Sequence, residues 1–358
     1  MQIMSNFAES IKMTATYCKF KQIYSFFCFT ILFVSCSGDK NIDISDIPVD
    51  VKIERFDHDF DQMRQKPMPQ QAAYLQKKYG NFYTDYIGQV LEAGNPADTA
   101  YFNTLRQIFA GAAYQDLKHD VDVAFPGNME KQNEQLTDAF RRINYYYPQK
   151  NLPKVYAYFS GFKAQTSIGD GYFGIGLDLF LGADSRFYPA LRETFPHYLS
   201  RRFTPDYIPT RVVEGIARED MFPEADTDHS LLSKMIYAGK ILYFMDKVLP
   251  NVAVTVKIGY TTEQMKWCKE VEGSIWGYFL DENLLYETDY QKIQTYLNEA
   301  PFTPGLGEHN NSAPKLGIWT GWQIVRKYMA DHTEVTLQQL MAEKDAQKIL
   351  NESKYRPK

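Results

Sequence analysis

The chain has 358 residues, of which 44% are hydrophobic and 23% are charged, and its formal net charge at pH 7 is −5. These proportions are typical of a globular protein and exclude a chain that stays disordered. The mild acidity, without a basic cluster, argues against nucleic acid as a partner. The length is enough for one large domain or two small ones.

The first feature along the sequence is an apolar segment, Ile23–Val34, which follows three lysines and contains no charge. It is too short to span a bilayer, which takes about 20 apolar residues, but it fits a signal-peptide core of roughly 7–15 residues. Phe33-Val34-Ser35-Cys36 ends it and resembles the lipobox of bacterial lipoproteins, in which the cysteine is acylated after cleavage. We therefore predict a signal peptide over residues 1–35, a lipid-anchored tether over 36–50 and a globular domain over 51–358.

Two other interpretations of this segment stay open, namely an ordinary secretory signal with an incidental cysteine and an anchor that is never cut. Met13 can serve as the start, which leaves a signal of ordinary length. Lipidation of Cys36 predicts a protein held at a membrane of the cell envelope, either the inner or the outer one. Cys18 and Cys28 leave with the signal, so Cys268 has no partner for an internal disulfide.

The elements expected in the domain are mostly helices, with a few strands near the middle. Apolar residues at helical spacing predict helices over 69–93, 98–110, 130–147, 188–203, 209–220, 230–249, 261–271, 316–331 and 336–351. Alternating or β-branched segments predict strands at 51–56, 154–159, 165–168 and 172–181. We therefore expect a single α+β domain that is predominantly helical, with a small sheet packed on helices.

The order of these elements is similar to that of zinc peptidases of the gluzincin type. Val213-Glu214-Gly215-Ile216-Ala217 resembles their Glu-Gly-x-Ala helix, which supplies the third zinc ligand. The preceding helix keeps only His197. If His197 is the first histidine of the motif, Tyr198 and Arg201 replace the rest, and if it is the second, Glu193 and Thr194 replace the first pair. No His-Glu-x-x-His occurs in the sequence. We therefore expect a zincin-like scaffold without a metal, with His197 as an interfacial histidine.

The sequence shows no other catalytic pattern: it has no Gly-x-Ser-x-Gly, and Cys268 fits a buried apolar residue better than a nucleophile. Lys240 interrupts an apolar helix, where a buried ammonium needs a carboxylate partner. Glu214 or Asp178 is the expected partner, as a remnant of a former metal site, and a lysine that reaches the surface is the alternative. We expect no catalytic residue, no metal and no cofactor, and a vestigial site or groove formed by His197, Glu214, Asp178, Arg201 and Lys240.

An ordered set of segments runs through the sequence. It consists of the lipobox at Cys36, Ile53–Asp57, Gly176–Gly182, Arg201–Phe203, Leu231–Met235, Ile318–Val325 and Ser353–Lys358. Together these segments resemble the gliding-motility lipoproteins of the GldB type from Bacteroidota, over nearly the whole length. The resemblance implies an envelope lipoprotein needed for gliding or for the linked secretion machinery, without a known reaction.

Two functions of different classes are open at this point. The first is non-catalytic binding or envelope assembly, by a protein held at the membrane through its lipid. Its groove would bind a peptide or another cell-envelope protein, with segment 172–181 as an edge strand for pairing. The alternative is an extracytoplasmic, peptidase-like hydrolase of unrecognised chemistry, since Glu and Asp are plentiful. A solute-binding lipoprotein would need two similar α/β lobes, which the helical second half does not offer.

Overall fold

Four short strands form one mixed sheet in the computed structural model, which describes residues 42–225, 227–307 and 311–358. In sheet order the strands are β1 (Glu54–Arg55), β2 (Lys154–Tyr158), β4 (Tyr172–Gly176) and β3 (Thr166–Gly169). β1, β2 and β4 run parallel, and β3 runs antiparallel to β4. Because β4 pairs on both sides, the prediction of an edge strand at 172–181 is wrong, and β1 and β3 are the edges.

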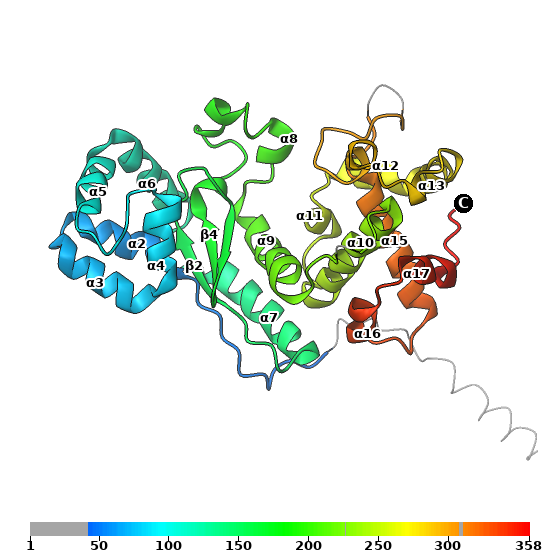
Figure 1. Cartoon of the computed structure of the whole chain (residues 1–358), viewed down its shortest axis with the longest axis horizontal. Helices are drawn as coiled ribbons and strands as arrows, with labels where there is room; N and C mark the ends of the chain where they lie inside the picture. Colours follow the sequence, from blue (N-terminus) through cyan, green and yellow to red (C-terminus); the bar gives the residue numbers. More distant parts are fainter. Residues whose placement is uncertain (1–41, 226, 308–310) are drawn as a thin grey trace, which may run out of the picture. The chain divides into compact units, whose positions relative to one another are not determined.

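The two faces of the sheet pack against different groups of helices (Figure 1). Side chains alternate between the faces along a strand. Tyr156 and Tyr158 therefore join an aromatic core, while Val155 and Ala157 join the larger aliphatic core. The helices of the aromatic side are α2 (Phe56–Asp61), α3 (Met68–Tyr79), α4 (Asn81–Asp85), the π-helix η3 (Tyr86–Val90) and α5 (Tyr101–Ala110).

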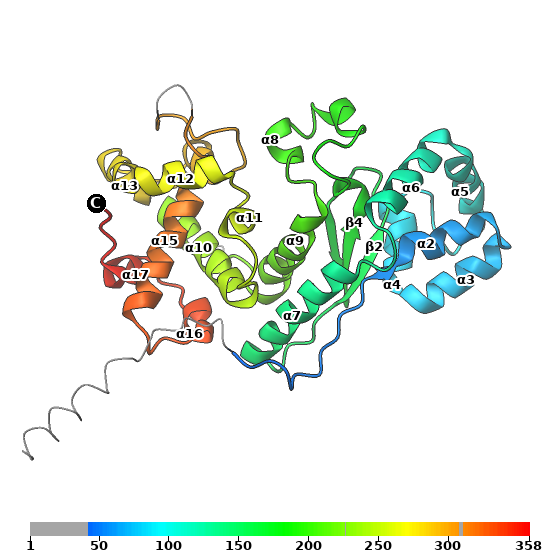
Figure 2. The same cartoon turned by 180° about the vertical axis from the view of Figure 1, so that it is seen from behind.

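Helices α7 (Glu130–Tyr146) and α9 (Ile208–Gly215) cover the opposite face of the sheet, which is seen from behind in Figure 2. The π-helix η7 (Ile216–Met221) continues α9. The apolar face of α7 brings Leu136, Phe140 and Ile143 into the aliphatic core. The helix α6 (Ala112–Ala124), which the sequence pattern did not predict, follows α5 and contributes to the same core.

The C-terminal half is helical and is centred on α10 (Leu231–Val248) and α15 (Leu316–Asp331), which lie side by side. Ser230 begins α10, since its hydroxyl accepts the N–H of Ser233. The helices around this pair are α11 (Val254–Ile258), α12 (Thr262–Glu270), α13 (Glu272–Asp281), α14 (Tyr290–Ile293), α16 (Leu337–Ala342) and α17 (Ala346–Ser353). Short 3-10 turns are η2 (Gln62–Arg64), η4 (Leu177–Leu179), η6 (Pro205–Tyr207), η8 (Leu284–Tyr286) and η9 (Gln294–Tyr296).

Three predicted helices are broken in the structure. The segment 69–93 divides into α3, α4 and η3, because Gly80 has φ 53° and ψ −126°, which is outside the helical region. The segment 188–203 forms only the 3-10 helix η5 (Tyr188–Leu191) and the short α8 (His197–Ser200). Pro196 lies between them, and a proline disfavours helix both at its own position and at the residue before it. The segment 336–351 divides into α16 and α17, because Glu343 is extended. The predicted class, α+β and predominantly helical in one domain, is confirmed. No helix in the described ranges has the length and apolar character needed to cross a membrane.

Candidate functional site

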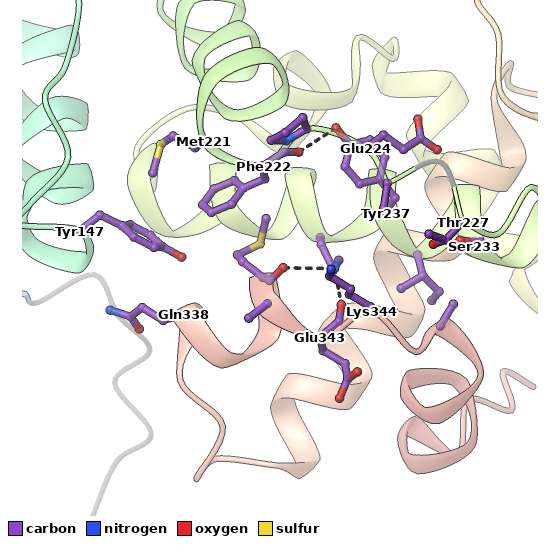
Figure 3. Close-up of a pocket in the computed structure, with 17 residues that line it drawn as sticks. Tyr147, Met221, Phe222, Glu224, Thr227, Ser233, Tyr237, Gln338, Glu343 and Lys344 are labelled. Carbon is purple, nitrogen blue, oxygen red and sulfur yellow. Dashed lines mark hydrogen bonds between the residues drawn. The ribbon is translucent and has the colours of Figure 1, made fainter.

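A pocket with a volume of about 400 Å³ opens between the loop after η7, one face of α10 and the end of α16 (Figure 3). Ser233, Ile236, Tyr237 and Lys240 reach it from α10, because residues three and four apart share a helix face. The apolar and aromatic part of the lining further includes Tyr147, Met221, Phe222, Pro223, Met341, Ala342 and Ala346. A concave, mostly apolar lining with a few polar groups is the usual form of a ligand pocket.

Two side chains of α10 fix the loop that forms one wall of this pocket. The hydroxyl of Tyr237 donates to the backbone oxygen of Phe222 at 3.1 Å. The ammonium of Lys234 contacts Oε1 of Glu224 at 2.9 Å. The loop is therefore held on α10, the helix that also brings Ser233, Tyr237 and Lys240 to the pocket.

Lys240 is the unusual residue of the pocket, because it is a cation only 9% exposed in an apolar helix. Its Nζ donates to the backbone oxygens of Glu343 at 2.7 Å and Met341 at 3.4 Å, as the dashed lines in Figure 3 show. Burial lowers its pKa, and the nearby carboxylate of Glu343 opposes that shift. The predicted pairing of Lys240 with Glu214 or Asp178 is therefore wrong, since its partners are carbonyl groups at the end of α16.

Tyr147 provides a second polar group on the opposite wall, where its hydroxyl is directed toward the pocket (Figure 3). This hydroxyl is buried and has no hydrogen-bond partner among the described residues. Burial raises the pKa of Tyr147 to about 12, so the group is a neutral donor at physiological pH. The pocket thus offers an ammonium and a free phenol O–H beside an apolar wall, which suits an apolar group with a nearby carboxylate.

Glu214 lies on α9 and lines a different cavity. Its two carboxylate oxygens accept hydrogen bonds from Arg211 at 3.1 Å and from Arg218 at 3.0 Å. Burial alone would raise the pKa of Glu214, but the two arginines outweigh burial and lower it. Both oxygens are thus occupied by guanidinium groups, which leaves this carboxylate poorly placed to bind a cation.

Asp178 is fully buried in η4, just after β4. It accepts the N–H and the hydroxyl of Ser160 at 2.7 and 2.8 Å, and also the N–H of Phe162. Burial raises the pKa of Asp178, against the effect of these hydrogen bonds. Its contacts hold the turn that follows β2 and do not reach the pocket around Lys240.

The remaining predicted residues do not join these groups into one site. His197 is exposed at the start of α8, and Arg201 donates to the backbone oxygen of Gly259 at 2.6 Å. Cys36 lies outside the described residues. Within the described ranges, no cluster of three or more His, Cys, Asp or Glu side chains could hold a metal ion. The five residues expected in a vestigial site thus lie in different local environments and do not form one site.

Most residues of the pocket have no distinctive signal in the sequence. Tyr147, Phe222 and Met341 come from three distant segments, and each had the appearance of an ordinary core residue. The one signal that marked the place was Lys240, a charge within an apolar helix.

Comparison with known proteins gives one match of a family model, described as gliding motility protein GldB, over residues 37–357. Neither a curated protein nor a solved structure matches the sequence. The zincin-like scaffold therefore stays a prediction. The family match spans almost the whole described domain and agrees with the ordered segments in the sequence. The chain belongs to the gliding motility protein GldB family.

Proposed function

We propose that this gliding-motility lipoprotein acts without catalysis, as a binding and assembly factor of the cell envelope. A lipid on Cys36 holds it at a membrane. The pocket between η7, α10 and α16 binds a segment of another envelope protein that carries an apolar side chain next to a carboxylate. The observation that carries this proposal is Lys240, a buried cation whose hydrogen-bond partners are neutral carbonyl oxygens.

The charge of Lys240 explains why the ligand should be acidic. A buried ammonium is stabilised most by a carboxylate in contact with it. The carboxylate of Glu343 does not provide that contact, because it binds Lys348 at 2.8 Å. A ligand carboxylate that enters the pocket would meet Lys240 and could accept the O–H of Tyr147.

The size of the pocket limits the ligand to a short segment. A volume of about 400 Å³ lies in the lower part of the range of roughly 300–1,000 Å³ found for small-ligand sites. One or two side chains, such as those at the carboxyl end of a polypeptide with an apolar last residue, would fill it. The wall of Met221, Phe222 and Met341 would contact the apolar part, and methionine adapts readily to different shapes.

Site-specific crosslinking in living cells tests the binding role. A photoreactive amino acid replaces Gln338, which lies exposed at the rim, in the full-length protein. We expect capture of an envelope protein through a peptide that contains an acidic residue or a free α-carboxylate. Lys240→Met should reduce the capture about tenfold, which corresponds to losing one charged contact. Lys266→Met, on the exposed side of α12, is the control and should leave it unchanged. If Lys240→Met captures as much envelope protein as the unchanged protein does, the proposal is contradicted.

The absence of catalysis has its own test. The full-length protein is purified without chelators and its metal content is measured, together with that of Glu214→Gln. The proposal expects no stoichiometric metal in either protein. Stoichiometric zinc that disappears on substitution of Glu214 would overturn it and favour the peptidase-like alternative.

A further inference from the structure

A second cavity, with a volume of about 40 Å³, lies between α9, η7, α11 and the start of α15. This volume admits roughly three water molecules. Its described cationic lining residues are Arg202, Arg211, Arg218, Lys257 and Lys315. Its described carboxylates are only Glu214 and Glu299. Positive charge therefore exceeds negative charge around a space large enough for a small ligand.

Each carboxylate of this cavity is shared by two cations. Glu214 binds Arg211 and Arg218, as described above. Glu299 accepts from Arg202 at 2.9 Å and from Lys315 at 2.6 Å. Lys257 contacts Asp246, which does not line the cavity, at 2.9 Å. With Lys257 set aside, the lining keeps an excess of two positive charges.

Two buried donors in the lining lack partners. The Nε atoms of Arg202 and Arg211 are buried and have no hydrogen-bond partner among the described residues. Arg202 is 3% exposed. A buried N–H without an acceptor is costly, and most such groups in folded proteins have a partner. Two arginines that line one cavity therefore each keep a buried donor without an acceptor.

The backbone around the cavity is shaped to hold these cations. Lys315 is in the left-handed region, with φ 53° and ψ 40°, a conformation uncommon for a residue with a side chain. Its Nζ donates to the backbone oxygen of Ile258 at 2.7 Å. The residue after Ile258, Gly259, has φ 79°, and a Cβ there would collide with Nη1 of Arg202. Strained and close-packed positions of this kind are common where a structure positions functional groups.

The lowered pKa of Lys315 agrees with the excess of positive charge around the cavity. Burial lowers the pKa of Lys315 to about 8, and the repulsion from Arg202 adds to this, although Glu299 opposes both. The N-terminus of α15, next to Lys315, contributes further positive potential. An anion in the cavity would relieve this repulsion.

We propose that the cavity binds a doubly charged tetrahedral oxyanion of the phosphate class, held by Arg202, Arg211 and Lys315. Guanidinium groups match phosphate oxygens in geometry as well as in charge. The excess of two positive charges fits such an anion better than a singly charged carboxylate. The side chains of Arg211, Arg218 and Glu299 are 26–33% exposed, so the cavity reaches the surface. Either free phosphate or the phosphate of a lipid headgroup can supply the ligand, and the assignment does not depend on the pocket around Lys240.

Calorimetric titration of the full-length protein in detergent with inorganic phosphate, at pH 7 and low ionic strength, tests this site. We expect saturable binding at one site, about tenfold tighter than that of acetate. Arg211→Gln should weaken the binding about tenfold, and Gly259→Ala should weaken it by displacing Arg202. Arg186→Gln, which removes an exposed partner of Asp120 elsewhere in the molecule, is the matched control and should bind as the unchanged protein does.

Thermal unfolding of the same proteins separates lost binding from lost folding. Phosphate should raise the melting temperature of the unchanged protein and of Arg186→Gln, compared with chloride at equal ionic strength. Arg211→Gln should unfold cooperatively but show a smaller rise. Any one of three results would overturn the proposal. These are the absence of saturable phosphate binding, acetate binding that is as tight as phosphate binding, and phosphate binding by Arg211→Gln that equals that of the unchanged protein. Phosphatidylcholine vesicles with and without phosphatidic acid then identify the source: competition by the acidic vesicles assigns a headgroup, and its absence assigns free phosphate.

Discussion

Gly239 on α10 and Gly321 on α15 face each other so closely that neither position has room for a side chain. A Cβ at Gly239 would collide with the backbone oxygen of Gly321, and a Cβ at Gly321 would collide with the backbone oxygen of Met235. The two helix backbones are therefore in direct contact at this point. Lys240, on the wall of the pocket, is the next residue after Gly239, so this contact also sets the position of the pocket lysine.

We expect Gly321→Ala to lower the free energy of unfolding by about 3 kcal/mol, because α15 has to move away from α10 to admit a methyl group. Urea denaturation of the purified protein measures this change. Gly277→Ala in α13 is the matched control, since a Cβ there meets nothing within 4 Å. It should raise the free energy of unfolding by about 1 kcal/mol through helix propensity. Equal stability of the two variants would show that the helices are not in backbone contact.

Asp178→Asn should lower the free energy of unfolding by about 3 kcal/mol. The carboxylate accepts two backbone N–H groups and one hydroxyl, and an amide would turn an NH₂ toward some of these donors. Chemical denaturation followed by tryptophan fluorescence is the measurement. Asp170→Asn, in the exposed turn between β3 and β4, should change stability by less than about 0.5 kcal/mol. A stable Asp178→Asn would mean that Asp178 does not hold the turn after β2.

Glu299 should make the fold sensitive to acid. Burial alone would raise the pKa of Glu299, but Lys315 and Arg202 lower it from its ordinary value of 4.5 to about 2. A carboxyl whose pKa is lower in the folded state stabilises the fold above about pH 4.5. That contribution, about 2 kcal/mol after allowance for partial exposure, is lost as the pH falls from 4.5 towards 2.

The comparison of unfolding at pH 7 and pH 3 measures this effect. Glu299→Gln should lose stability at pH 7 and show a weaker decline towards pH 3 than the unchanged protein. Glu270→Gln, at an exposed position of α12, should show the full decline. If Glu299→Gln declines as steeply as the control, the ion pairs of Glu299 do not contribute to stability.

Cys36→Ala tests the membrane anchor. Without the thiol no lipid can be attached, so the protein should appear uncut or free of the membrane and should not incorporate labelled palmitate. Cell fractionation and metabolic labelling give the two readouts. Cys28→Ala, within the apolar core of the expected signal, should be processed and labelled normally. A Cys36→Ala protein that is still processed and lipidated would overturn the lipoprotein prediction.

The sequence predicted best the elements whose signals are local. The helix expected at 230–249 is α10 at Leu231–Val248, and the helix expected at 316–331 is α15 with the same bounds. The apolar periodicity of α10 and its cap at Ser230 both depend only on residues close together in the sequence, so the sequence alone reveals them. The order of strands in the sheet depends on distant pairing, and β4 was therefore mistaken for an edge strand.

The candidate site was only partly visible for the same reason. The charge in an apolar helix singled out Lys240, but its partners are backbone oxygens of residues 341 and 343, which carry no side-chain signal. The pairing of Arg202 with Glu299 had no signal in the sequence, since it joins segments far apart in the chain. Glu214 was expected near Lys240, yet two arginines within four residues bind it instead.

The pairing of β1 with β2 bears on when the protein is able to fold. Glu54 pairs with Tyr156, so the edge of the sheet cannot form until the whole intervening segment has emerged and the later strand is in place. Pairings between distant residues close large loops and therefore slow folding. The N-terminal part thus lacks its sheet partner while the rest is still being made. Under the proposed export of the chain, this delay would keep it unfolded and therefore competent for translocation.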